Sequence, residues 1–432
     1  MPAGYHLDID FDGVKDLLFA TNAAGASENR DGIRAYKNVG TNEQPQFIFQ
    51  PNGFLQREMI DNGRGSIPIF VDLNGDGLMD LMVANNYRYK SFLQRSSQIQ
   101  YYQNIGTAES PAFSLINDDW ANLSTAGYSN RIVPGFGDLD NDGMLDMVLG
   151  TDNGFVHWYK KNGPGYNDYA LHEFQMKDLN DNPIHVQSFA SPVLYDLNKD
   201  GLLDLIVGRR IGGIHYYQNV GTANNPSFEL ITNNLGKVDL ATSNSPETLA
   251  ILQFVEVNDT LHLFVGGRAG TIHYYVDIEN NIHDGGAFTL LSTTYANIHT
   301  GGFAAPAIAK IRNNNAFDLI VGGELGGLWA YTADPNSDPI LTTEDVFQEK
   351  NIPLKPILFP NPTQNQTFTI SNLGKGAQIS IFDLSGKKIP YEIVSDESES
   401  ILIKLPDVQA GLYIVNMVTN KQHLHQLKLL VE

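Results

Sequence analysis

One nine-residue loop occurs four times in the first 204 residues, and it constrains the fold more than any other feature of the chain. The copies span Asp8–Asp16, Asp72–Asp80, Asp138–Asp146 and Asp196–Asp204. Each copy has an oxygen-bearing side chain at loop positions 1, 3, 5 and 9, and a glycine at position 6 that allows a tight turn. Carboxylates packed this closely repel one another, and a hard divalent cation with oxygen ligands relieves the repulsion. The loops therefore predict about four Ca2+ sites, which we expect to be structural.

The candidate metal ligands are the side chains at positions 1, 3, 5 and 9, namely Asp8, Asp10, Asp12, Asp16, Asp72, Asn74, Asp76, Asp80, Asp138, Asp140, Asp142, Asp146, Asp196, Asn198, Asp200 and Asp204. An EF-hand loop begins in the same way, but it needs a glutamate at position 12 and flanking helices. Position 12 falls here within an apolar run and is Phe19, Val83, Leu149 or Val207. The EF-hand interpretation is therefore disfavoured.

Short β-rich segments recur in a fixed order after the loops. Apolar runs begin at residues 16, 80, 146, 204, 262 and 318, which are 56 to 66 residues apart. A second strand follows each run and ends in a tyrosine, namely Tyr36, Tyr102, Tyr159, Tyr217, Tyr275 or Tyr331. Such a period of several short strands is typical of a β-propeller, in which neighbouring four-stranded blades cover one another. We expect an all-β chain with six visible blades in residues 1–335, and a longer parent protein has room for a seventh.

The fifth and sixth repeats lack the acidic loop. In the fifth repeat the four ligand positions hold Phe254, Glu256, Asn258 and His262. In the sixth repeat Lys310 and Arg312 take the first and third ligand positions. Because a fixed cationic side chain replaces the charge of an ion, we expect no metal at Lys310.

The loop pattern, followed by Leu-x-Val-Gly, resembles the FG-GAP or VCBS repeat of integrin-α-like propellers and of many secreted bacterial propellers. The resemblance covers residues 1–335. It implies that the backbone carbonyl at position 7 also binds the ion, which adds the carbonyls of Val14, Leu78, Met144 and Leu202 to the candidate ligands.

The charge of the chain excludes some classes of partner. The formal net charge is -21, which argues against nucleic acid and against anionic membrane surfaces. The chain has no cysteine, so disulfides and thiolate chemistry are excluded. It has no apolar run long enough for a transmembrane segment. The start of the chain does not read as a signal peptide, so for an exported protein we expect one upstream.

The last eighty residues differ in character from the rest. Residues 336–354 read as a linker, and alternating strands in residues 355–432 predict a small Ig-like β-sandwich. The segments Leu358–Pro362, Ile381–Lys387 and Ala410–Val415 resemble the type A C-terminal sorting domain of the type IX secretion system. The resemblance implies that residues 355–432 engage the type IX secretion machinery of a Bacteroidetes-type bacterium. It also implies that the protein is secreted or held at the outer-membrane surface.

These features together predict a calcium-binding propeller that acts as a binding or adhesion module rather than an enzyme. We expect a monomer whose partner is an unknown extracellular protein or glycan. Two alternatives stay open, a carbohydrate-binding lectin and a calcium-dependent propeller polysaccharide lyase or hydrolase. Candidate segments for a ligand face are 85–90, 118–120 and 163–166, and the column of His157, His215 and His273 reads as blade packing.

Overall fold

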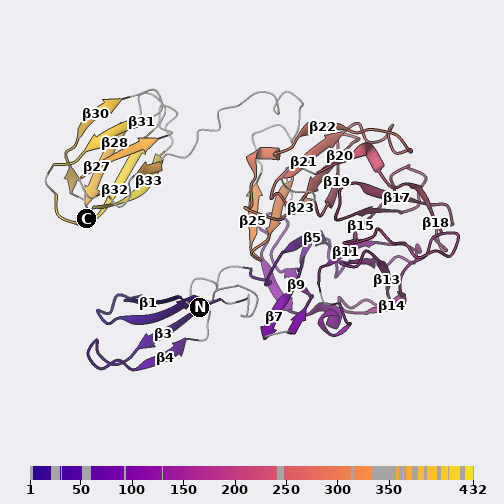
Figure 1. Cartoon of the computed structure of the whole chain (residues 1–432), viewed down its shortest axis with the longest axis horizontal. Helices are drawn as coiled ribbons and strands as arrows, with labels where there is room; N and C mark the ends of the chain where they lie inside the picture. The colour runs from indigo at the N-terminus through magenta and orange to yellow at the C-terminus, as the bar shows by residue number, and fades with distance from the viewer. Residues whose placement is uncertain are drawn as a thin grey trace. The chain divides into compact units, whose positions relative to one another are not determined.

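The structure is a computed structural model of the chain. It describes residues 3–20, 30, 32–50, 60–91, 94–128, 130–240, 248–312, 316–332, 357–359, 363, 366–371, 378–383, 387–396, 400–406, 408–418 and 424–431. The chain forms two compact units, Met1–Leu341 and Thr342–Glu432 (Figure 1). The predicted linker at residues 336–354 lies outside the described residues.

Each of the six predicted repeats forms one antiparallel sheet. The first sheet contains β1 (Ala3–Leu7), β2 (Asp16–Ala20), β3 (Ile33–Asn38) and β4 (Phe47–Gln50). The second contains β5 (Ile67–Val71), β6 (Asp80–Ala84), β9 (Ile99–Asn104) and β10 (Phe113–Asn117). A hairpin between β6 and β9 adds β7 (Arg88–Ser91) and β8 (Gln94–Ser96). The third contains β11 (Ile132–Gly137), β12 (Asp146–Thr151), β13 (Val156–Lys161) and β14 (Tyr169–Glu173).

The remaining repeats follow the same plan. The fourth sheet contains β15 (Ser191–Tyr195), β16 (Asp204–Gly208), β17 (Ile214–Asn219) and β18 (Phe228–Thr232). The fifth contains β19 (Ile251–Val257), β20 (Thr260–Gly266), β21 (Ile272–Val276) and β22 (Thr289–Ser292). The sixth contains β23 (Ala304–Ala309), β24 (Asp318–Gly323) and β25 (Leu328–Thr332). The described helices of this unit are short 3-10 turns, namely η1 (Trp120–Thr125), η2 (Leu235–Lys237) and η3 (Tyr295–Asn297). The all-β architecture is confirmed, and no described helix is long and apolar enough to cross a bilayer.

One hydrogen bond, repeated between neighbouring sheets, shows how the propeller closes. A backbone N–H at or just before the first strand of a sheet donates to a carbonyl at or just after the end of the second strand of the preceding sheet. These bonds join Ser66 to Gly323, Ile132 to Asn85, Ala190 to Thr151, Ala250 to Arg209 and Ala304 to Gly267, at 2.9–3.4 Å. Because Ser66 bonds to the sixth sheet, the ring closes from the sixth repeat to the second. All six predicted sheets are present, but the described ring contacts join five of them.

The glycine that ends most of the apolar runs has a steric reason. A Cβ atom on Gly208 would lie 2.3 Å from the carbonyl oxygen of Ala250 in the next blade, and one on Gly322 would lie 2.0 Å from that of Ser66. Gly150 and Gly266 meet the next blade in the same way. The glycine therefore lets adjacent blades approach closely enough for the closing hydrogen bonds.

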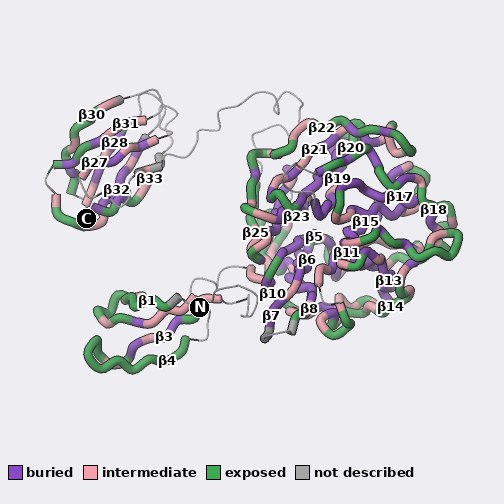
Figure 2. The backbone as a smooth tube through the Cα atoms, viewed as in Figure 1, coloured by how far each residue is buried: buried purple, intermediate pink, exposed green. Residues whose placement is uncertain are grey.

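The first strands of the ring blades are innermost, because they line a central channel. It encloses a cavity of ≈ 200 Å³ that is lined by β5, β11, β15 and β19 and by Pro306 of β23. Pro68, Pro134, Pro192 and Pro306 share one register on these strands. The innermost strand of a blade is an edge strand, where the missing N–H of proline breaks no ladder. Figure 2 shows buried residues along the inner strands of the ring.

The first sheet has the same strand order as the other blades but is less buried. In β2 only Asp16 is buried, whereas all five residues of β6 and of β16 are buried (Figure 2). A blade needs neighbours on both faces to bury its apolar residues. The exposure of the first sheet agrees with a ring that closes without it.

The C-terminal unit is a two-sheet sandwich. One sheet has the order β26 (Ile357–Phe359), β27 (Thr367–Ser371), β31 (Ser400–Lys404) and β30 (Glu392–Asp396). The other has the order β29 (Lys388–Ile389), β28 (Gln378–Asp383), β32 (Gly411–Val418) and β33 (Leu424–Val431). Alternate residues of both sheets, such as Phe368, Ile403, Ile381 and Val415, are fully buried in one core. The predicted sandwich is confirmed.

Candidate metal centres

Backbone N–H groups shape each acidic loop around its first carboxylate. The aspartate at position 1 (Asp8, Asp72, Asp138 or Asp196) accepts hydrogen bonds from the N–H groups at positions 5 and 6, at 2.8–3.2 Å. The position 5 carboxylate accepts from the N–H at position 7, at 2.8–2.9 Å. The glycine at position 6 has φ of +85° to +90°, a left-handed conformation that favours glycine. The loop therefore curls around the carboxylate at position 1.

The aspartate at position 9 has a structural role that the sequence reading missed. Asp16, Asp80, Asp146 and Asp204 are 0 % exposed. One oxygen of each accepts a backbone N–H from the third strand, at 2.7–3.0 Å. In three loops the other oxygen accepts from an aromatic side chain of that strand, which is Tyr101, Trp158 or Tyr216. This aspartate therefore fastens its loop to the blade.

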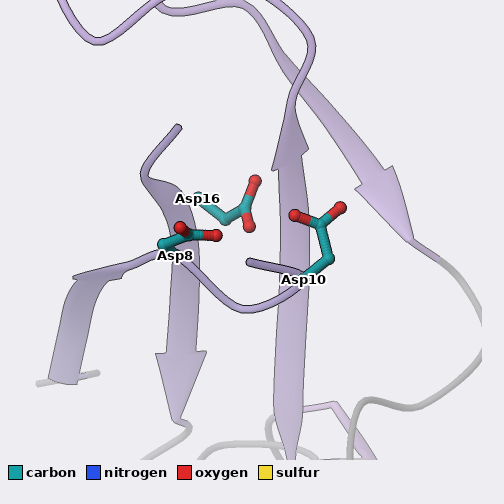
Figure 3. A group of neighbouring side chains, drawn as sticks. All are labelled: Asp8, Asp10 and Asp16. Carbon is teal, nitrogen blue, oxygen red and sulfur yellow. The ribbon is translucent and has the colours of Figure 1, made fainter. Parts of the chain in front are cut away.

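The geometry of the first and third loops suits a hard cation. Carboxylate oxygens of Asp8, Asp10 and Asp16 lie within 4.8 Å of one another, and Figure 3 shows the three side chains facing a common space. Asp138, Asp140 and Asp142 meet the same limit. Oδ1 of Asp140 is buried and accepts no hydrogen bond within the described structure. An oxygen-only donor set with an orphaned buried oxygen fits calcium, and the assignment of the ion stays a prediction.

A residue on the third strand varies together with loop position 3. Lys37 contacts Asp10 and Asp12, and Lys160 contacts Asp140 and Asp142. The second and fourth loops have asparagine at position 3, and the residues that correspond to the lysines are Gln103 and Gln218. There the asparagine amide donates to the position 5 carboxylate at 2.8 Å. The first and third loops therefore combine four carboxylates with a lysine, and the second and fourth combine three carboxylates with no lysine. The summed formal charge of these side chains is -3 at every loop.

Burial and crowding perturb the acids of these loops. Burial, followed by the nearby Asp140 and Asp142 carboxylates, raises the pKa of Asp146 to about 6. Burial also raises the pKa values of Asp80 and Asp204. The hydrogen bond from Lys37 lowers the pKa of Asp10. Because a bound cation favours the charged form of its ligands, metal binding at these loops is expected to release protons.

The fifth and sixth repeats replace the acidic loop with other contacts. His262, at position 9 of the fifth repeat, lies 2.8 Å from the Tyr274 hydroxyl through Nδ1. In the sixth repeat the guanidinium of Arg312 forms two hydrogen bonds to Asp318, the position 9 carboxylate. Lys310 lies over the Phe317 ring, 4.9 Å from its centroid. Arg312 thus pairs with the position 9 carboxylate of this repeat, and the absence of a metal at Lys310 stays a prediction.

Some candidate ligand-face residues prove to be core. Trp120 is 0 % exposed and donates through Nε1 to the carbonyl of Tyr166, so it offers no ring to a ligand. Arg88 is 6 % exposed and pairs with Asp118. Burial would raise the pKa of Asp118, but hydrogen bonds from Arg88 and Gln100 hold it well below its usual range. Arg88, Gln100 and Asp118 therefore form a polar network in the second blade, whereas residues 163–166 are exposed or half-buried.

The histidine column also belongs to blade packing. His157 and His215 are buried, and burial lowers the pKa of each to about 4. In the tyrosine column, Tyr102, Tyr159, Tyr217 and Tyr275 are each less than a tenth exposed, whereas Tyr331 of the sixth blade is 38% exposed.

Comparison with protein families supports the motifs in two segments. Residues 72–149 and 138–207 match the family described as FG-GAP-like repeat. Residues 357–432 match the family described as secretion system C-terminal sorting domain. The chain thus contains FG-GAP-like repeats in residues 72–207 and a type IX sorting domain in residues 357–432, which support a secreted protein of the β-propeller type.

Solved structures and curated proteins add little. The chain is similar to AofleA from Arthrobotrys oligospora, at 12% identity over 77% of this chain and 83% of that one, with a TM-score of 0.37. It is also similar to a glycoside hydrolase family 43 arabinoxylan arabinofuranohydrolase from Bacillus subtilis in complex with cellotetraose, at 11% identity over 86% and 95%, with a TM-score of 0.35. Similarities this weak carry no argument about fold or function. No curated protein matches.

Proposed function

We propose that this protein is a calcium-stiffened binding module that the type IX system delivers to the cell surface or the medium. The observation that carries the calcium assignment is the convergence of loop oxygens, with the buried Oδ1 of Asp140 lacking any hydrogen bond in the described structure. The ion would be held by the side chains at positions 1, 3, 5 and 9 and the carbonyl at position 7. Its chemistry there is charge neutralisation, which lets the loop between the first two strands of a blade stay ordered.

The repeated architecture supports binding rather than catalysis. Five blades are joined by the same backbone hydrogen bond, and the second, third and fourth acidic loops lie at one end of this ring. The loops at the other end differ in side chain from blade to blade while their flanks repeat. A rigid scaffold that presents variable loops is a typical binding architecture.

A chelator experiment on the whole chain tests the calcium assignment. An ion present at about 100-fold excess over its Kd stabilises the folded state by about 2.7 kcal/mol per site. In a unit of this size that corresponds to a rise in Tm of about 4 °C per site. We expect Tm in millimolar calcium to exceed Tm in chelator by at least this amount, and equal values would refute bound calcium. Turnover of a polyuronate that is lost on chelation would refute the non-enzymatic assignment.

A further inference from the structure

One lysine contacts two neighbouring acidic loops at once. Lys161 ends β13 of the third blade, and its backbone N–H donates to Oδ1 of Asp146, at position 9 of the third loop, at 3.0 Å. Its side-chain Nζ donates to the backbone carbonyl of Leu73, at position 2 of the second loop, at 2.9 Å. The N–H of Leu73 in turn donates to Asp80, at position 9 of the second loop, at 3.3 Å. A short series of hydrogen bonds therefore joins the position 9 carboxylates of the two loops.

Both ends of the contact between the blades are shielded from water. Lys161 is 7% exposed and Leu73 is 0% exposed. The Lys161 ammonium also lies 5.8 Å from the centre of the Tyr169 ring. Burial lowers the pKa of Lys161, and the nearby carboxylates of Asp168 and Asp72 oppose this shift. A hydrogen bond from a buried ammonium group is strong, because solvent does not compete for either partner.

Lys161 stands where the other acidic repeats have an asparagine. Asn38, Asn104 and Asn219 make the same backbone bond to the position 9 carboxylate of their own loops. Each asparagine side chain then donates to the carbonyl at position 8 of its own loop, at 3.2–3.3 Å. The longer lysine side chain extends past its own loop to the preceding blade. The third repeat has therefore exchanged a contact within one blade for a contact between two blades.

The next boundary of the ring has a contact in the same direction. Asn224 of the fourth blade donates through Nδ2 to the backbone carbonyl of Asp140, at position 3 of the third loop, at 3.2 Å. Asn224 is exposed, so water competes for this bond. Of these two contacts, the buried one made by Lys161 is the better suited to transmit order from one loop to the next.

We propose that Lys161 couples the second and third loops, so that the two loops bind calcium with positive cooperativity. This coupling rests on the proposed calcium sites and adds a form of regulation to them. An ordered second loop fixes the Leu73 carbonyl, and with it the Lys161 side chain. A fixed Lys161 holds the N–H that Asp146 accepts, so the third loop loses less conformational entropy when it binds its own ion. By linkage the effect is equal in the reverse direction.

The test measures, on the intact chain, how the state of the second loop changes the calcium Kd of the third. Trp158 Nε1 donates to Asp146 at 3.1 Å, so tryptophan excitation detects Tb3+ at the third loop, and displacement of Tb3+ gives the calcium Kd. Asp76→Ala removes a candidate ligand of the second loop and leaves the third loop intact. It is expected to raise the third-loop Kd about fivefold, which is about 1 kcal/mol, the net contribution of one hydrogen bond.

Two variants of Lys161 show whether the lysine carries this effect. Lys161→Asn copies the other acidic repeats and keeps the backbone bond to Asp146, and Lys161→Met keeps an unbranched side chain without the donor. In both backgrounds Asp76→Ala is expected to leave the third-loop Kd unchanged, because the contact between the loops is lost. Lys177→Gln, which removes an exposed charge that pairs with Asp181, controls for net charge and is expected to retain the full effect of Asp76→Ala.

The possible outcomes separate the coupling from the calcium assignment. A third-loop Kd that Asp76→Ala does not change would overturn the coupling and leave the calcium assignment in place. An effect of Asp76→Ala that persists in both Lys161 variants would also overturn the coupling, because the lost charge then acts through space. A purely structural lysine would give this second result together with a lower Tm. Tb3+ that calcium does not displace would refute the calcium assignment, and the coupling with it.

Discussion

Replacement of Lys160 by glutamine is expected to tighten calcium binding at the third loop. Lys160 Nζ lies 3.1 Å from Asp142 Oδ2 and also contacts Asp140, two candidate ligands of the ion. An ammonium group that touches the same carboxylates repels a divalent cation bound there. The lysine therefore lowers the affinity that four carboxylates alone would give.

The size of the effect follows from Coulomb's law. Two unit charges about 4 Å apart interact by about 1 kcal/mol even in bulk water, so a unit charge against a divalent ion is worth about 2 kcal/mol. Since 1.4 kcal/mol is tenfold in Kd, Lys160→Gln is expected to lower the Kd at this loop by about thirtyfold. Added salt screens the effect and brings the two values together.

Trp158 gives this loop a specific optical reporter. Its indole Nε1 donates to Asp146 of the loop at 3.1 Å, so excitation of tryptophan sensitises the luminescence of Tb3+ bound there. Displacement of Tb3+ by calcium then reports the calcium Kd of the third loop. Two control variants copy the second and fourth loops, which have asparagine at position 3 and glutamine in place of the lysine. They are Asp140→Asn and the double variant Asp140→Asn/Lys160→Gln.

The wild type, Asp140→Asn, Lys160→Gln and the double variant form a double-mutant cycle that varies the charge at the third loop. Asp140→Asn alone is expected to weaken binding, Lys160→Gln alone to strengthen it, and the double variant to return to the wild-type value. Charge matching would be refuted by a double variant that binds as weakly as Asp140→Asn, or by a Lys160→Gln variant with an unchanged Kd. Lys177→Gln controls for net charge and is expected to have no effect.

Three further outcomes follow from the fold. Gly322→Ala is expected to lower the free energy of unfolding in urea by about 1–3 kcal/mol, because its Cβ would lie 2.0 Å from the Ser66 carbonyl oxygen. Gly327→Ala is the control, because a Cβ there meets nothing within 4 Å. Equal stabilities of the two variants would contradict the ring closure between the sixth and second sheets. His215→Phe is expected to change the pH dependence of stability. The pKa of His215 is about 4 in the fold and about 6.5 when unfolded, so the unfolded chain binds more protons as pH falls from 6.5 to 4. The wild type should then lose about 1.4 kcal/mol more per pH unit than the variant, and parallel curves would contradict a buried neutral ring. Deletion of residues 357–432 is expected to leave the protein inside the cell envelope in fractionation of a type IX host, and continued surface display would contradict the sorting role.

Local features of this protein were predictable from its sequence. The nine-residue loops and the following apolar strands depend on neighbouring residues, so turn glycines and strand propensities reveal them directly. The sandwich strands of the C-terminal unit follow from period-two alternation in the same way. Asp16 and its equivalents were recognised as acids of the loop.

Features that depend on distant contacts were not predictable. The ring closes when Ser66 bonds to Gly323, and no local pattern distinguishes this partner from a neighbour in the first repeat. Trp120 read as a ligand-face residue because its burial depends on Tyr166, which lies 46 residues away. The lysine of the third strand was missed, although Lys37 and Lys160 alternate with glutamine in step with loop position 3. This covariation between repeats of one chain was the sequence signal that could have revealed the contact between the lysine and the loop.

An anomalous difference map from crystals grown in millimolar calcium would locate the bound ions directly. One peak is expected within each acidic loop and none at the sixth repeat, where Arg312 is hydrogen-bonded to the carboxylate of Asp318. Loops that are ordered but without peaks beside Asp8, Asp72, Asp138 and Asp196 would contradict the calcium assignment.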